Sequence, residues 1–338
     1  MSIQELSALG IVTAAVVYLL AFMAHAAEWA SARGLSAEPT GAEPVEAPEL
    51  VGARAGSTAG GPVEATTSAE PVHASRLSSP DDEAARVRVD MFGRLGLGLT
   101  LIALVSHALG TVLRGVAANR APWGNMYEFT ISALLFVVVA YVWLALTRNM
   151  RWLGLPITLL LAVGNGLAAT VFYVAVAPLV PALHSVWFII HIVAACIAGA
   201  AFNLGGMASI IYLFQERAEA KAVGTPRTGY LAKLPTAKQM DTFAYRAHAF
   251  AFPIWTFTIA AGSIWAEYAW GRFWGWDPKE TWSLVTWVVY AMYLHARATA
   301  GWRGRNAAVI AIIGVASFWF NFIGINLLVS GLHSYAGI

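Results

Sequence analysis

Long apolar stretches separated by short polar segments dominate this chain. Most reach the roughly 20 residues that a helix needs to cross about 30 Å of hydrocarbon. The pattern therefore predicts an all-α polytopic membrane protein. The predicted membrane-spanning helices, with boundaries good to a few residues, are about eight: 8–27, 92–113, 126–146, 153–174, 186–214, 246–268, 282–298 and 307–330.

The region 31–90 does not follow this pattern. It is rich in Ala, Pro, Glu, Ser and Gly and shows no apolar period. Such a composition cannot bury enough apolar surface to offset the entropy of ordering the chain. We therefore expect a disordered cytoplasmic linker between an N-terminal transmembrane helix (1–30) and a seven-helix domain (91–338). The first apolar stretch lacks a basic leader and a small-residue cleavage site, so we interpret it as a retained helix.

Composition supports a membrane protein and excludes several functional classes. Hydrophobic residues make up 58% of the chain and charged residues 12%, about half the charged share of a soluble domain. A net charge of +2 argues against a polyanionic partner such as nucleic acid. The single cysteine, Cys196, excludes a disulfide framework, a Cys-x-x-Cys redox pair and a Cys-x-x-Cys-His haem attachment site within the chain.

The distribution of Lys and Arg predicts which loops face the cytoplasm. The connections after the third, fifth and seventh predicted spans are rich in basic residues, and the linker also contains several arginines. The positive-inside rule places these segments in the cytoplasm. Both termini and the connection between the sixth and seventh spans then lie outside. One short outer loop, with Arg114 and Arg120, is an exception.

That outer connection holds an unusual number of tryptophans. Six of the fourteen lie between Trp265 and Trp287, and glycines interrupt the cluster. Each indole offers a wide flat face, so the cluster predicts a surface that stacks on a flat ligand. An aromatic belt at the membrane interface is the alternative, but a belt distributes its tryptophans over many helix ends. The segment 277–280 (Asp-Pro-Lys-Glu) predicts that the seventh helix begins at Pro278, with Asp277 as its cap.

Several of the eight histidines are candidates for binding haem iron. Neutral imidazole is a common axial ligand, and an ionisable residue within a span is a functional candidate. His191 and His333 are both predicted near the outer face, where they could bracket an iron above the tryptophans. His295 is predicted deeper, in the seventh span. His184 is predicted near the outer surface. We interpret the four remaining histidines as structural or solvated: His25, His73, His107 and His248.

With these motifs in place, the chain resembles a known family. It is similar to the CcsA/ResC-type multispan subunit of the System II cytochrome c synthase, within the tryptophan-rich WWD haem-handling proteins. The resemblance covers roughly residues 119–338, whereas residues 1–90 carry no motif of the family. It rests on the segments Pro122–Glu128, Leu183–His191, Trp270–Trp282, Tyr293–Arg297, Gly301–Gly304 and Gly331–Tyr335.

The resemblance implies roles for individual residues. His191 and His333 would be the two external axial ligands, and His295 a transmembrane ligand. His184 stands where the family usually has Gln, so it could compete with His191. Independently of the resemblance, Arg272 or Lys279 could pair with haem propionates, because both flank the tryptophan-rich loop and the start of the seventh helix favours anions. An ordinary cation anchor at the membrane interface is the alternative for both residues. The tryptophan-rich loop, about 265–287, would be the haem platform, through Trp270, Gly271, Arg272, Trp274, Trp276, Asp277 and Trp282.

The implied function is cytochrome c biogenesis in a bacterial cytoplasmic membrane. The protein would bind haem b, move it to the outer face and present it for thioether attachment to the Cys-x-x-Cys-His motif of an apocytochrome c. It would act as a haem lyase component with a ResB/CcsB-type partner subunit and with proteins that keep the apocytochrome thiols reduced. No residue of this chain is assigned as a general acid or base.

Three alternatives remain open at this stage. The protein could be a haem transporter or chaperone that does not itself catalyse attachment. It could be a b-type cytochrome subunit that passes electrons, although such a subunit normally places histidine pairs at matched depth in the bilayer. It could also be an assembly subunit without a cofactor, in which the tryptophans form only a docking surface.

Overall fold

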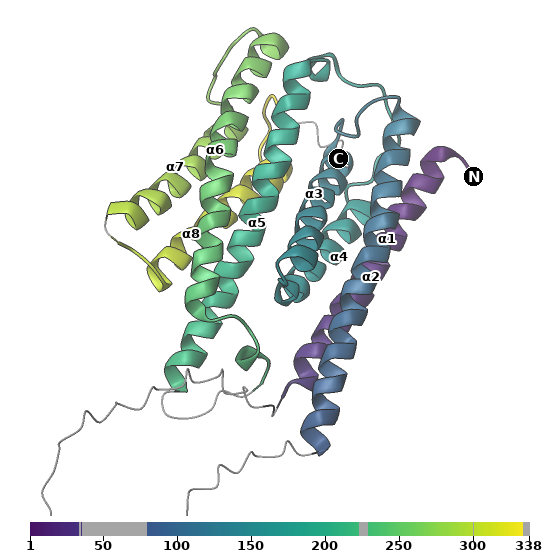
Figure 1. Cartoon of the computed structure of the whole chain (residues 1–338). Helices are drawn as coiled ribbons and strands as arrows, with labels where there is room; N and C mark the ends of the chain where they lie inside the picture. Colours follow the sequence, from purple (N-terminus) through teal and green to yellow (C-terminus); the bar gives the residue numbers. More distant parts are fainter. Residues whose placement is uncertain (34, 36–79, 223–228, 300, 334–338) are drawn as a thin grey trace, which may run out of the picture.

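The computed structural model describes residues 1–33, 35, 80–222, 229–299 and 301–333 (Figure 1). This part of the chain is helical apart from its connections. The eight long helices are α1 (Ile3–Ser31), α2 (Pro80–Ala118), α3 (Met126–Thr147), α4 (Gly154–Thr170), α5 (Val186–Lys221), α6 (Ala237–Trp270), α7 (Pro278–Thr299) and α8 (Arg305–Trp319). The shorter elements are η1 (Arg151–Leu153), η2 (Pro181–Leu183), η3 (Tyr230–Ala232), the π-helical turn η4 (Phe320–Gly324) and α9 (Ile325–Leu328).

The predicted all-α membrane fold is confirmed. Seven helical segments of the described residues are long and apolar enough to cross a membrane, and one of them runs continuously from Arg305 to Leu328 through α8, η4 and α9. Helix α7 corresponds to the seventh predicted span, 282–298, and is not among these seven segments. The protein is therefore a multi-pass membrane protein.

Local capping signals explain where several helices begin. Ser2 and Glu5 form a reciprocal capping box at the start of α1, and Thr236 and Gln239 form another at the start of α6. Each box satisfies backbone N–H groups that have no partner within the helix. Asn125 caps α3 in a similar way, because its side chain accepts a hydrogen bond from the third residue of the helix.

The boundaries predicted for the linker were too wide. Helix α2 begins at Pro80, so residues 80–90 are helical rather than part of a linker. At the other end, Ala32 and Leu35 are buried in a small cluster with Ala85 and Val89 of α2. These few apolar positions are hidden in a polar composition, which is why the sequence pattern missed them. The rest of the predicted linker lies outside the described residues.

The helices form two neighbouring groups, α1–α4 and α5–α8, and α3 contacts α5 between them (Figure 1). Helices α1 and α2 approach closely because small residues face each other. A Cβ on Gly10 would lie 3.0 Å from the Cα of Gly110. Across the same contact Ser7 Oγ donates to Gly110 O at 2.7 Å. Small residues and short hydroxyl bonds are a typical way to pack helices within a bilayer.

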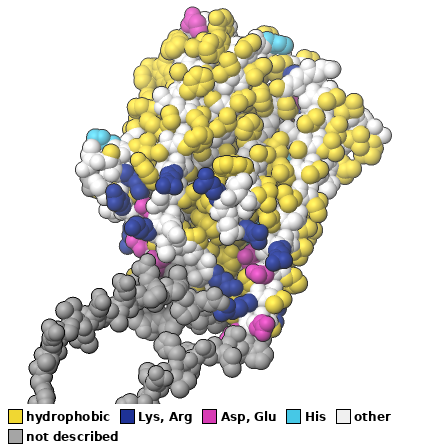
Figure 2. Space-filling model, in the orientation of Figure 1, with side chains coloured by type: hydrophobic (Ala, Val, Ile, Leu, Met, Phe, Trp, Pro, Cys, Tyr) yellow, Lys and Arg dark blue, Asp and Glu magenta, His cyan; other side chains and the backbone are white. Residues whose placement is uncertain are grey.

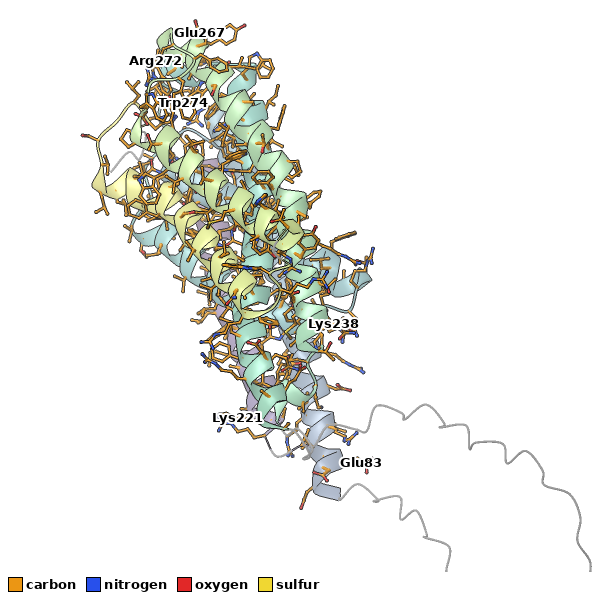
Figure 3. The ribbon with its side chains drawn as sticks, turned by 90° about the vertical axis from the view of Figure 1, so that its left-hand side faces the viewer. Glu83, Lys221, Lys238, Glu267, Arg272 and Trp274 are labelled. Carbon is orange, nitrogen blue, oxygen red and sulfur yellow. The ribbon has the colours of Figure 1, made fainter. Side chains whose placement is uncertain are left out.

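On the face seen in Figure 2, most Lys and Arg side chains lie toward one end of the molecule. Figure 2 shows a largely apolar surface with the Lys and Arg side chains toward its lower part. Figure 3 places Lys221 and Lys238 toward one end and Arg272 and Trp274 at the other. The tryptophan-rich loop and the basic connection between α5 and α6 are therefore at opposite ends, as the sequence predicted.

The two arginines that broke the charge pattern are paired. Arg114 Nε donates to Glu128 Oε1 at 2.9 Å, and Arg120 Nη1 donates to Glu128 Oε2 at 2.6 Å. The side chains of Arg114 and Glu128 are fully buried, and that of Arg120 is 15% exposed. Their charges are therefore compensated locally: Arg114 joins α2 to α3, and Arg120 joins the following connection to α3.

Candidate functional site

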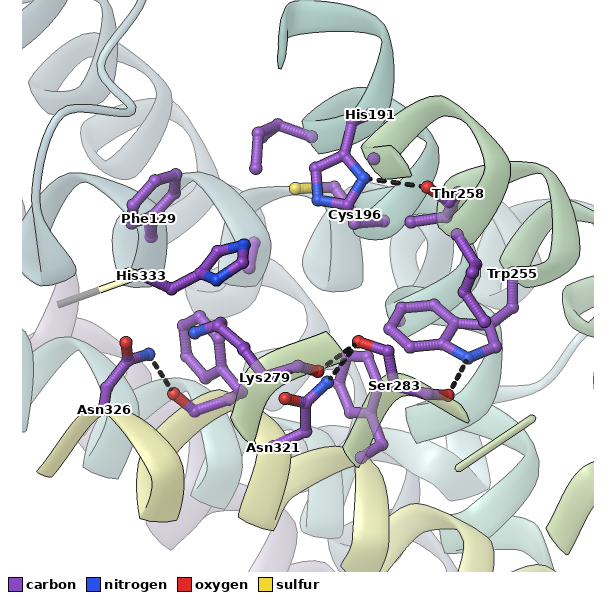
Figure 4. A pocket seen from close by; sticks show the side chains of 18 of the residues that line it. Phe129, His191, Cys196, Trp255, Thr258, Lys279, Ser283, Asn321, Asn326 and His333 are labelled. Atoms are coloured by element: carbon purple, nitrogen blue, oxygen red, sulfur yellow. Dashed lines mark hydrogen bonds between the residues drawn. The ribbon is translucent and has the colours of Figure 1, made fainter. Parts of the chain in front are cut away.

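A large cavity lies among α3, α5, α6, α7 and the C-terminal segment, next to the tryptophan-rich loop (Figure 4). Its empty space is about 1470 Å³, part of which opens to the outside. Helices α3, α5 and α6 contribute mainly apolar side chains to its wall. The charged side chains, Lys279 and Glu280, come from the first turn of α7, and the two histidines, His191 and His333, come from α5 and the C-terminal segment. A mostly apolar space with a few convergent polar groups is typical of a site for a hydrophobic ligand.

His191 enters the cavity from α5 in a fixed orientation. Its Nδ1 lies 2.8 Å from Thr258 O of α6. Because a carbonyl can only accept, Nδ1 carries the proton and Nε2 carries the lone pair. The ring has room only because position 262 is glycine, since a Cβ there would lie 2.8 Å from Nδ1. Trp265 stacks on the imidazole, with ring centroids 5.9 Å apart.

His333 lines the same cavity from the segment that follows α9. Its Nδ1 lies 2.7 Å from Asp277 Oδ1, and the neighbouring Leu332 N donates to Asp277 Oδ2 at 2.8 Å. The ring packs edge-on against Trp270 and Trp265, with centroids 4.8 and 5.5 Å away. One carboxylate thus holds both the backbone and the imidazole of the C-terminal segment.

The electrostatics of this pair keep His333 in the form that can bind a metal. Burial alone would raise the pKa of Asp277, but hydrogen bonds from His333 and from the backbone of Leu332 and Lys279 lower it to about 2. Burial lowers the pKa of His333, although Asp277 opposes that shift. At neutral pH the pair is therefore a carboxylate and a neutral imidazole, whose Nδ1–H donates and whose lone pair is on Nε2.

Trp265 brings the two histidines together, because both rings contact it. It is 2% exposed, and its Nε1 donates to Ala182 O at 2.7 Å, which fixes the indole. Two imidazoles, each held through Nδ1 by an acceptor, match the usual arrangement of metal-binding histidines. His191 and His333 are therefore the residues that would hold a haem iron, each through its Nε2.

Glu280 organises the tryptophan-rich loop from the first turn of α7. Its Oε2 accepts from Gly275 N at 2.9 Å, from Asp277 N at 3.1 Å and from Arg272 Nη1 at 3.5 Å. Lys279 N donates to Asp277 Oδ1 at 3.1 Å. The prediction that α7 begins at Pro278 behind an Asp277 cap is confirmed. The loop is therefore held by the cap of the helix that it precedes.

The predicted platform residues of this loop do not all face the cavity. Trp274 lines it, and Trp276 meets Trp274 edge-on at 5.8 Å while remaining 67% exposed. Trp282 packs on Phe320 with centroids 4.3 Å apart and is not among the residues that line the cavity. Gly271 ends α6 with φ +66°, a left-handed conformation that favours glycine. The platform role of the whole loop stays a prediction.

The other histidines lie elsewhere. His295 is exposed on α7 and His184 is exposed after η2, and neither lines this cavity. His184 Nε2 contacts Leu179 O at 3.4 Å. His107 is buried, with Nε2 2.9 Å from Ile131 O. The geometry thus favours His191 over His184 as a partner for His333.

Sequence reasoning missed three residues that shape the site. Trp265 was counted in the tryptophan cluster but not as the contact between the histidines. Thr258 contributes only a backbone carbonyl, and Gly262 contributes only the absence of a side chain. The spacing of Thr258, Gly262 and Trp265 puts them on one face of α6, but that periodicity does not distinguish a ligand wall from ordinary helix packing.

Comparison with known proteins assigns the chain to a family. Residues 101–333 match the model of the cytochrome c assembly protein family. This chain belongs to that family. Relatives over most of their length include the cytochrome c biogenesis protein CcsA of Gloeobacter violaceus, 32% identical over 75% of this chain and 89% of the relative. Another is the CcsA of Synechococcus sp. strain CC9902, 35% identical over 72% of this chain and 87% of the relative.

A solved structure shares the fold of this member of the cytochrome c assembly family. The structure titled cytochrome c haem lyase CcmF superposes with a TM-score of 0.59 at 12% identity. The match covers 99% of this chain and 53% of the other, so this chain spans about half the length of that structure. At this identity the similarity is one of fold.

Proposed function

We propose that this protein serves cytochrome c biogenesis by binding haem between His191 and His333 and presenting it to apocytochrome c at the outer face of the membrane. Its family and the names of its CcsA relatives support the biological process. The fold shared with a protein named as a haem lyase supports the kind of chemistry. Haem b is the substrate, and its iron would take one imidazole from each histidine.

One observation carries this proposal. His191 and His333 are 142 positions apart in the chain, yet both pack on Trp265 and both line one cavity. In each ring Nδ1 faces an acceptor, which leaves the lone pair on Nε2. An ordinary packing histidine needs only one satisfied contact, whereas a matched pair at a large cavity is what axial ligation requires.

The protein's contribution to attachment is positioning. Thioether formation adds each S–H of the apocytochrome across one haem vinyl group, and the chemistry resides in the haem and the thiols. Residues of this chain would hold the iron, keep the porphyrin against the aromatic wall and exclude water from the apolar part of the cavity. No side chain here is proposed as a general acid or base.

His295 has a different place in the proposal. It is exposed on α7, away from the cavity, so it could bind haem only together with a second protein. We assign it to an earlier step, in which a ResB/CcsB-type subunit supplies the other ligand within a bacterial cytoplasmic membrane. Thiol-reducing proteins would keep the apocytochrome ready for reaction.

The test is the visible spectrum of the full chain, purified with its partner subunit, beside His191→Gly, His333→Gly and His295→Gly variants. We expect a bis-imidazole haem spectrum that is altered in the first two variants and restored by added imidazole. His184→Gly is the matched control and should leave the spectrum unchanged. A parent protein that never carries haem, or variants that all keep the parent spectrum, would refute the assignment. Haem binding without attachment would indicate a haem chaperone instead.

A further inference from the structure

Lys279 places a positive charge in the mostly apolar cavity, which Glu280 also lines. It lies in the first turn of α7 and lines the cavity together with His333 and Asn326. Figure 4 shows these three side chains at the same end of the space. The start of α7 adds the positive end of a helix dipole. The cation and the helix start therefore favour an anion here, whereas the apolar side chains that line much of the cavity favour hydrocarbon.

The other charged groups of the loop each have at least one partner, although Glu280 Oε1 has none among the described residues. Asp277 accepts from His333 and from backbone N–H groups, and Glu280 Oε2 accepts from Arg272 and from two backbone N–H groups. Among the described residues, no carboxylate lies within 4.0 Å of Lys279 Nζ, whose recorded contact is the Phe322 ring at 6.0 Å. Lys279 is thus the cation of this loop that lacks an anion.

We propose that Lys279 binds a propionate carboxylate of the haem and so fixes which edge of the porphyrin faces the start of α7. This rests on the proposed haem site and adds the orientation of its ligand. A porphyrin held by His191 and His333 needs its two acidic side chains at a polar edge. Apolar side chains that line the cavity, among them Phe129 and Phe188, would then contact the apolar part of the ring.

Arg272 is the other basic residue near the loop, and the structure separates the two. Arg272 pairs with Glu280 and its guanidinium lies over the Trp270 ring at 6.0 Å. It does not line the cavity. Lys279 lies ahead of the predicted span 282–298, and burial lowers its pKa to about 8 although Asp277 opposes the shift. Its amine is therefore still mostly protonated at neutral pH.

The test compares haem with its dimethyl ester, in which both propionates are neutral. The full chain with its partner is titrated with both probes, beside the Lys279→Met and Lys279→Arg variants, the competing candidate Arg272→Met and the control Lys238→Met, which is exposed and far from the loop. Dissociation constants are read from the absorbance. Lys279→Met should weaken haem binding by roughly tenfold to a hundredfold, the size of a lost charged hydrogen bond. It should leave binding of the ester unchanged, and Lys279→Arg should restore most of the affinity for haem.

The outcomes separate this proposal from the proposed function. If the parent shows no bis-imidazole spectrum, the haem site itself fails and Lys279 fails with it. If the parent and Lys279→Met both show that spectrum with equal haem affinity, only the role of Lys279 is refuted. Equal weakening of haem and ester in Lys279→Met also refutes it, because the residue would then act on the structure and not on the carboxylate. A loss confined to Arg272→Met would transfer the role to Arg272.

Discussion

Gly262→Ala tests whether the orientation of His191 matters for haem. The added Cβ would lie 2.8 Å from Nδ1 and 2.9 Å from Cε1 of His191, whereas ordinary contacts begin at 3.4 Å. The ring must therefore move by about 0.6 Å from Nδ1, the difference between 3.4 and 2.8 Å. It cannot move without disturbing its 2.8 Å bond to Thr258 O or its stacking on Trp265.

The expected magnitude follows from these contacts. Overpacking of this kind costs about 1–3 kcal/mol, and the higher helix propensity of Ala returns about 0.5–1 kcal/mol. The free energy of unfolding should therefore fall by about 0–2.5 kcal/mol. Haem affinity should fall roughly tenfold to a hundredfold, as for other changes to groups that orient a metal-binding imidazole.

The assay for Gly262→Ala is a haem titration followed by absorbance, with and without free imidazole. Gly166→Ala is the matched control, because a Cβ at that helical glycine meets nothing within 4 Å. The control should bind haem like the parent, and imidazole should recover part of the affinity lost in Gly262→Ala. A Gly262→Ala protein that binds haem within about twofold of the control would refute the reasoning, since the proposed ligation needs His191 in its observed orientation.

Two further predictions concern charge. Burial lowers the pKa of His333 below the ordinary histidine value of about 6.5, so the neutral ligand should persist as the pH falls through that value. The bis-imidazole spectrum should therefore be the same at about pH 7.5 and pH 6 and should disappear only at lower pH, and a loss beginning above about pH 6.5 would contradict this. Arg114→Met should destabilise the protein by about 1.5–3 kcal/mol, because it removes a buried charged hydrogen bond while Arg120 still compensates Glu128. Thermal unfolding in detergent measures the change, and exposed Arg303→Met is the control that should unfold like the parent.

The fold was largely predictable because the bilayer constrains it strongly. A backbone in hydrocarbon must satisfy its own hydrogen bonds, so long apolar stretches become helices. The linker boundary was not predictable in the same way. Ala85 and Val89 are two apolar positions among charged neighbours, and only contact with Ala32 and Leu35 gives them a place to be buried. A composition average over the region hides such a local exception.

In the site too, local features could be predicted from the sequence and long-range contacts could not. Asp277 is an example of both. Its role at the start of α7 could be predicted, because capping depends on residues within one turn. Its bond to His333 could not, because that contact joins positions 56 residues apart and depends on how the segment after α9 returns to the cavity. The same carboxylate therefore supports the tryptophan-rich loop and orients an axial ligand. A loss of haem on changing Asp277 cannot be attributed to the tryptophans alone, and the state of His333 has to be measured first.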